Sequence, residues 1–111
     1  IEKFKNKFSN IELLKWGETC EFDIIINATS VGLKIKDELN LNFDSLKSGI
    51  IFYDTIYNPP LTNFLNKAKN NKQIIINGKL MLVYQAQKSF QFWNNIMPEV
   101  NEKILRILNN D

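Results

Sequence analysis

Three runs of apolar, mostly β-branched residues stand out along the chain. They cover residues 22–27, 49–54 and 73–78, and each contains consecutive isoleucines without polar alternation. A continuous apolar run of this length is typical of a strand that is buried on both faces of a sheet. The pattern therefore predicts three buried strands, and residues 11–14 are a candidate for a shorter edge strand.

Helical periodicity follows the second and third runs. A spacing of three and four residues between apolar positions predicts a helix over 60–68, whose two leading prolines are compatible with a first helical turn. A longer helix is expected over 80–94, and its nearly continuous apolar early turns predict burial against both the sheet and a partner. A last helix can begin at Pro98, and residues 1–8 are typical of the end of another helix.

Strands that alternate with helices predict an α/β fold with a largely parallel sheet. Such sheets bind ligands at the carboxyl ends of their strands. The loops at these ends cover residues 27–33, 55–60 and 77–81. These three loops form the candidate site.

The first two loops offer groups that could contact a ligand, and each group also has an ordinary structural explanation. Thr29 and Ser30 can offer hydroxyl or N–H groups to carbonyl or phosphate oxygens, but hydroxyl residues also cap common turns. Tyr57 could reach into a crevice or pack its ring on the sheet edge. Asp54 could act as a base, although we favour a role in holding its own loop through hydrogen bonds to the backbone.

The third loop leads into the long helix. Gly78 allows a turn and a close approach of the backbone to a ligand. Met81 and Gln85 are four residues apart and so share one helix face. Gln85 lies in an apolar stretch and needs a polar partner there, unless it points to solvent.

Composition narrows the classes of function. The chain has 111 residues, the size of one domain, and a net charge of +2, with Arg106 as its one arginine among 14 basic residues. This balance argues against nucleic-acid binding, and no apolar run is long enough to span a membrane. The absence of histidine excludes Ser-His-Asp and Cys-His catalysis and most zinc sites within the chain, so we expect no metal site. The lone Cys20 excludes an internal disulfide framework.

The start of the chain carries neither an initiator methionine nor an apolar signal region. We therefore expect a piece of a longer, cytoplasmic protein.

Taken in order, the three loops and the long helix resemble the cofactor domain of the shikimate dehydrogenases. The resemblance spans nearly the whole chain. The matching residues are 27–30 with Gly32; Tyr53, Asp54, Tyr57, Asn58 and Pro59; Gly78, Met81, Leu82, Val83, Gln85, Ala86, Phe90 and Trp93; and 97–99.

This resemblance implies an NADPH-dependent reduction of 3-dehydroshikimate to shikimate in chorismate and aromatic amino acid biosynthesis. Residues 1–111 would be the C-terminal portion of the dinucleotide-binding domain, the second half of a Rossmann-like sheet with flanking helices, and residues 79–111 its closing helices. The family's glycine-rich pyrophosphate turn and its Lys and Asp proton-transfer pair match no position here. We therefore expect no catalytic residue in this segment, no activity from it alone, and a missing N-terminal part as its partner.

The family's binding positions transfer to seven residues of this chain. The resemblance assigns cofactor contacts to Thr29, Ser30, Thr55, Gly78 and Met81. It assigns hydrogen bonds with shikimate to Tyr57 and Gln85.

Two departures from the family pattern leave alternatives open. Leu80 stands where the family commonly has a glycine, and Thr55 stands where many members have methionine. NADP against NAD preference, and shikimate against quinate as substrate, therefore stay open. A receiver-like regulatory domain is a further alternative, based on Asp54 and Lys79, but it lacks the acidic pair that receivers need after their first strand.

Overall fold

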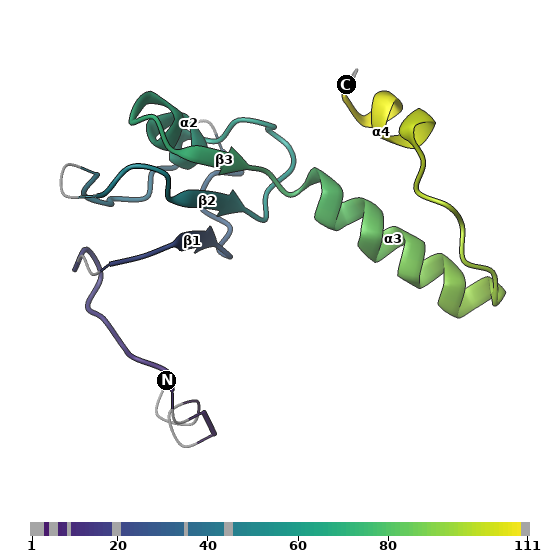
Figure 1. The fold of residues 1–111 in the computed structure, drawn as a ribbon, viewed down its shortest axis with the longest axis horizontal. Helices are drawn as coiled ribbons and strands as arrows, with labels where there is room; N and C mark the ends of the chain where they lie inside the picture. Colours follow the sequence, from purple (N-terminus) through teal and green to yellow (C-terminus); the bar gives the residue numbers. More distant parts are fainter. Residues whose placement is uncertain are drawn as a thin grey trace.

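The computed structural model describes residues 4, 7–8, 10–18, 21–34, 36–43 and 46–109. Its sheet consists of β1 (Ile24–Asn27), β2 (Ile51–Asp54) and β3 (Ile74–Ile76), in that order and all parallel (Figure 1). The α/β fold and the parallel sheet are thus confirmed. The predicted helical end over residues 1–8 falls mostly outside the described residues, as does Cys20.

The predicted edge strand over 11–14 is wrong. These residues are exposed and carry no strand. They belong to a segment that runs away from β1 in Figure 1, so they have no neighbouring strand to supply hydrogen bonds.

Three helices complete the described fold, namely α2 (Asn63–Asn70), α3 (Lys79–Asn94) and α4 (Glu102–Asn109). Helix α2 begins after the prolines because the hydroxyl of Thr62 caps it, accepting a hydrogen bond from the Leu65 N–H at 3.3 Å. Helix α4 begins at Glu102 rather than at Pro98, since the side chain of Asn101 accepts a hydrogen bond from the Ile104 N–H at 3.3 Å.

One face of the sheet carries the core. Phe52 on β2 is fully buried, and its ring lies 5.3 Å from the ring of Phe64 on α2. Ile25 and Ile75, which neighbour Phe52 in register, pack partly against the same cluster. Helix α2 therefore covers this face over β2 and β3.

The opposite face of the sheet is open within the described chain. Because side chains alternate along a strand, it carries Ile24 and Ile26 of β1, exposed by 53% and 60%, and the corresponding Ile74 and Ile76 of β3. The prediction that these strands are buried on both faces is wrong for this chain. The described helices that contact the sheet leave this face without cover.

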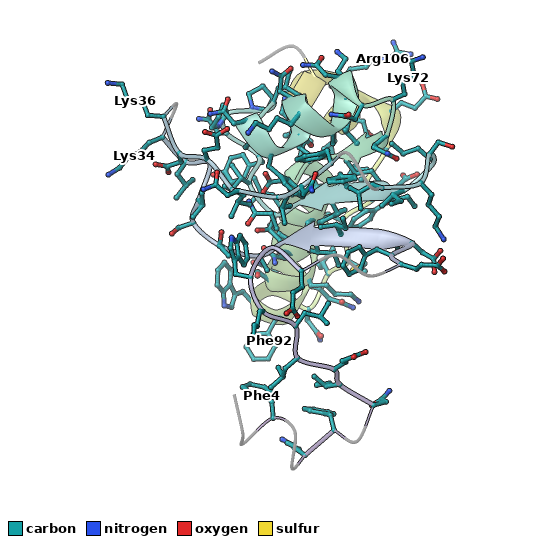
Figure 2. All side chains as sticks on the ribbon, turned by 90° about the vertical axis from the view of Figure 1, so that its left-hand side faces the viewer. Phe4, Lys34, Lys36, Lys72, Phe92 and Arg106 are labelled. Atoms are coloured by element: carbon teal, nitrogen blue, oxygen red, sulfur yellow. The ribbon has the colours of Figure 1, made fainter. Side chains whose placement is uncertain are left out.

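Helix α3 leaves the end of β3 and extends away from the sheet (Figure 1). None of its residues is buried, and the large aromatic side chain of Phe92 projects below the strands in Figure 2. The predicted burial of this helix against sheet and partner is therefore wrong within this chain. Helix α3 is bonded to the segment that precedes α4, since the Gln87 side chain donates to the Pro98 carbonyl at 2.8 Å.

Candidate functional site

The three candidate loops leave the sheet at one edge. The strands are parallel, and Asn27 at the end of β1 is the register partner of Asp54 at the end of β2. Each loop therefore starts beside the next one. The topology alone brings the predicted site residues of different loops into reach of one another.

Asp54 is the buried centre of this edge. Its Oδ1 accepts hydrogen bonds from the Asn27 Nδ2 at 3.1 Å and from the Ile56 N–H at 3.0 Å, and its Oδ2 accepts from the Thr62 hydroxyl at 2.6 Å. The hypothesis that Asp54 holds its own loop is confirmed. Full burial also removes this carboxylate from contact with a solvent-borne phosphate donor, which argues against the receiver-like alternative.

Asn27 is buried as well, and the sequence alone suggested no separate role for it. Its Oδ1 accepts from the Thr29 N–H at 3.1 Å and from the Thr29 hydroxyl at 2.7 Å, while its Nδ2 also donates to the Val31 carbonyl at 3.0 Å. The one signal in the sequence is an Asn two residues before a Thr at a strand end, which is a common turn pattern.

Thr55 ties the second loop to the first. Both its N–H and its hydroxyl donate to the main-chain carbonyl of Asn27, each at 3.0 Å. The hydroxyl of Thr55 is thus engaged inside the protein. Thr29 and Ser30 lie in the first loop as exposed residues, although the N–H and the hydroxyl of Thr29 are both bonded to Asn27.

Gly78 joins the third loop to the second. It is buried, and its N–H donates to the Ile56 carbonyl at 3.0 Å. A Cβ atom at this position would lie 2.1 Å from the main-chain oxygen of Thr55, so glycine is required by the packing of the two loops. Its φ is −75°, and Leu80 lies within the helical first turn of α3, so the departure at Leu80 needs no unusual backbone.

The remaining predicted site residues are Tyr57, Met81 and Gln85, which are more exposed than Asp54 and Gly78. Tyr57 is 45% exposed and lines a hollow of about 260 Å³ with Asn58, Lys79 and Leu82. Met81 is half-buried in the first turn of α3, and Gln85 is exposed one turn later. No hydrogen bond joins Tyr57 to Gln85 in the described part of the chain. The structure thus links Thr29, Thr55 and Gly78 through hydrogen bonds and packing, whereas Tyr57 and Gln85 are exposed side chains with no bond between them in the described residues.

Other kinds of site find little support in the described residues. No group of three or more potential metal-ligating side chains occurs among them. None of the helices found there has the length and apolar character needed to cross a membrane. Figure 2 shows Lys34 and Lys36 on one side of the molecule and Lys72 and Arg106 on another.

Comparison with curated proteins finds relatives with a shared name, although no protein-family model matches the chain. The shikimate dehydrogenase (NADP(+)) of Pelagibacter ubique is 52% identical over 106 residues, which are 96% of this chain and 40% of that protein. The one of Methanococcus aeolicus is 40% identical over 82 residues, 72% of this chain and 30% of that protein. The chain thus spans less than half the length of these relatives.

Among solved structures, both a shikimate dehydrogenase and a reductase of another name match the chain. A shikimate dehydrogenase in complex with NADP+ matches with a TM-score of 0.66 and 34% identity, over 79% of this chain and 30% of the other. A 5-ketofructose reductase of Gluconobacter matches with a TM-score of 0.66 and 32% identity, over 79% of this chain and 32% of the other.

Proposed function

The chain belongs to the shikimate dehydrogenase family over the length that it spans, and from this premise we propose that it forms the nicotinamide end of an NADPH-dependent reductase of 3-dehydroshikimate. The observation that carries the proposal is the hydrogen-bonded edge of the sheet, where Thr29, Thr55 and Gly78 come from three loops. Residues 1–111 then form the C-terminal portion of a Rossmann-like dinucleotide-binding domain, with 79–111 as its closing helices.

The cofactor assignment rests on the match between this edge and the needs of a nicotinamide ring. NADPH supplies a hydride when it is bound, and the relatives carry NADP+ in their names. Ser30 offers an exposed polar side chain, and Thr29 is exposed next to it with its N–H and hydroxyl bonded to Asn27. Thr55, Gly78 and Met81 follow in the next two loops, where Thr55 and Met81 are half-buried and Gly78 is buried. These residues lie in loops that start at a hydrogen-bonded edge of the sheet. Such loops can hold a flat ring in one orientation for hydride transfer.

The substrate contacts come from Tyr57 and Gln85 in this proposal. Both side chains are exposed in the described chain and so are available to a ligand that approaches from outside. Neither is proposed as an acid or base, because we assign proton transfer to a substrate domain that this chain does not contain.

The proposed partner is that remaining part of the same cytoplasmic protein. The apolar open face of the sheet and the unburied α3 support it, since contiguous apolar surface of this kind is typical of a docking site. The chain also covers 40% of the Pelagibacter relative, which leaves more than half of such a protein to supply the cover.

The test is the activity of the full-length protein that contains this segment, compared with the activity of the 111 residues alone. We expect NADPH oxidation with 3-dehydroshikimate from the full-length protein and none from the isolated chain. A full-length protein without this activity overturns the proposed reaction. A rate from the isolated chain contradicts the assignment of the proton-transfer groups to another domain.

One of the structural matches supports a second candidate substrate. The 5-ketofructose reductase matches this chain as well as the shikimate dehydrogenase does, so the same architecture serves different carbonyl substrates. The kcat/KM values of the full-length protein for shikimate and quinate with NADP+ and NAD+, and for 5-ketofructose with each reduced cofactor, decide between them.

Tyr57 provides the sharpest test of the substrate contacts. We expect Tyr57→Phe to raise the KM for shikimate by about two- to tenfold, because it removes one hydrogen bond worth about 0.5–1.5 kcal/mol. Tyr84→Phe is the matched control, because Tyr84 is also exposed but lies on α3, and this change should leave the KM for shikimate unchanged. Unchanged kinetics in Tyr57→Phe would remove Tyr57 from the site.

A further inference from the structure

Asn27 makes hydrogen bonds to both loops that carry the proposed cofactor contacts. Its side chain is bonded to Thr29 in the loop after β1, and its main-chain carbonyl is bonded to Thr55 in the loop after β2. The residue is only 3% exposed, so it is unavailable to a ligand itself. It can influence a bound cofactor only through its neighbours.

The hydrogen-bond partners determine the orientation of the Asn27 amide. Oδ1 faces two donors, the N–H and the hydroxyl of Thr29, whereas Nδ2 faces two acceptors, the Val31 carbonyl and the Asp54 carboxylate. A rotated amide would place its NH2 group against the Thr29 N–H and its oxygen against the carboxylate. Only the observed orientation of the amide gives both its oxygen and its NH2 group suitable hydrogen-bond partners.

These bonds set the distance between the two loops. Thr29 is held from two sides, because its hydroxyl donates to Asn27 and accepts from the Val31 N–H at 3.1 Å. Thr55 is held by its two bonds to the Asn27 carbonyl. Asp54 connects the Asn27 side chain to the second loop, because its Oδ1 accepts hydrogen bonds from both the Asn27 amide and the Ile56 N–H.

We propose that the Asn27 side chain is a positioning group for the nicotinamide end of the site, acting through its bonds to Thr29 in the first loop and to Asp54, which holds the second loop. The inference rests on the proposed function for its consequence in catalysis. A shift of one of these loops would displace the ring from its geometry for hydride transfer, and misplacement by about 1 Å can lower a rate by about a hundredfold.

Asn27→Asp is the variant that isolates this role. Asp keeps the size of the side chain and an oxygen for Thr29, but it loses both donors and places a second carboxylate against Asp54. Asn71→Asp is the matched control. Asn71 lies at the C-terminal end of α2, where its Nδ2 donates to the Lys67 carbonyl at 2.9 Å, and its hydrogen bonds there go to residues of α2 itself.

In the full-length protein we expect Asn27→Asp to lower kcat by about ten- to hundredfold and to change the KM for NADPH much less. This split follows because only the nicotinamide end is displaced, while the rest of the cofactor binds elsewhere. Amide hydrogen exchange should become faster at Val31 and Ile56, whose N–H groups bond to the two partners of the Asn27 side chain, while Phe52 in the core stays protected. Asn71→Asp should change neither readout.

Two outcomes overturn the proposal. One is a kcat of Asn27→Asp that equals the wild-type value per folded molecule. The other is faster exchange throughout the sheet, which would show general destabilisation. Should Asn27→Asp not fold, Asn27→Ser answers the same question, since its hydroxyl can accept from Thr29 but is too short to bridge to Asp54.

The test also separates this inference from the proposed function. If the wild-type protein shows no NADPH-dependent reduction, the proposed function fails and the exchange experiment still applies. Local loosening of the two loops in Asn27→Asp then supports Asn27 as the residue that positions them, and unchanged exchange overturns it.

Discussion

At the scale of single residues, glycine at position 78 is required by contact between two loops. The sequence suggested a close approach of Gly78 to a ligand, whereas the structure shows its close approach to the main chain of Thr55. We expect Gly78→Ala to lower the free energy of unfolding of the full-length protein by about 1–3 kcal/mol, because the backbone must shift to accept the methyl group.

Urea denaturation measures this loss, and Gly49→Asn is its control. Gly49 has a positive φ of 83°, with no atom within 4 Å of an added Cβ, and asparagine adopts a positive φ at a smaller cost than most residues. Its substitution should therefore cost less. An equal or smaller loss in Gly78→Ala would contradict the steric argument.

The same scale shows which site residues the sequence can indicate. The role of Asp54 was predictable because a carboxylate at a strand end commonly bonds to nearby N–H groups. The part played by Asn27 was not, since its main partners Asp54 and Thr55 are adjacent only after β1 and β2 pair. No local pattern contains that information.

At the scale of elements, helix α2 is joined to the site by its cap. The Thr62 hydroxyl accepts from the Leu65 N–H and donates to the Asp54 carboxylate, so one buried group serves both helix and strand end. We expect Thr62→Val to cost about 2–4 kcal/mol in unfolding free energy, since it removes a cap and a hydrogen bond to a charged group.

Thr62→Ser is the matched variant because it keeps the hydroxyl and loses a single methyl group, at a cost of about 1 kcal/mol. Thermal and urea unfolding of the two variants should separate them clearly. Equal losses in both would mean that packing of the methyl group, and not the hydrogen bonds, stabilises this position.

The elements themselves were largely readable from the sequence. All three predicted strands and all three later helices are present. Their starts were less predictable, because helices α2 and α4 begin at polar caps, Thr62 and Asn101, rather than at the prolines before them. A cap is identified by the hydrogen bond that it makes, and several polar residues near each start could have made one.

At the scale of the whole molecule, the sheet has one covered face and one open face. We expect the open face to be covered in the full-length protein, so that Ile26→Asn there lowers the free energy of unfolding by about 2–4 kcal/mol. Ile26 is 60% exposed in the described chain, and this exposure alone would predict a much smaller effect.

Lys69→Asn on the exposed surface of α2 is the control and should lower stability by about 1 kcal/mol or less, since it changes helix propensity and one surface charge in the last turn. Chemical denaturation of the full-length protein gives both values. A small effect of Ile26→Asn, equal to that of the control, would show that this face stays open to solvent.

The strands, the helices, the parallel α/β class and the family resemblance are readable from the sequence, because these depend on local periodicity and on short motifs. The covered faces of this chain, and the residues that hold the loops together, become known only from the folded arrangement of these elements. The isoleucine runs indicate that both faces of the strands need burial, but they do not indicate which segment covers each face. Likewise, Asn27, Thr55 and Gly78 acquire their partners only when parallel strands bring distant loops to one edge.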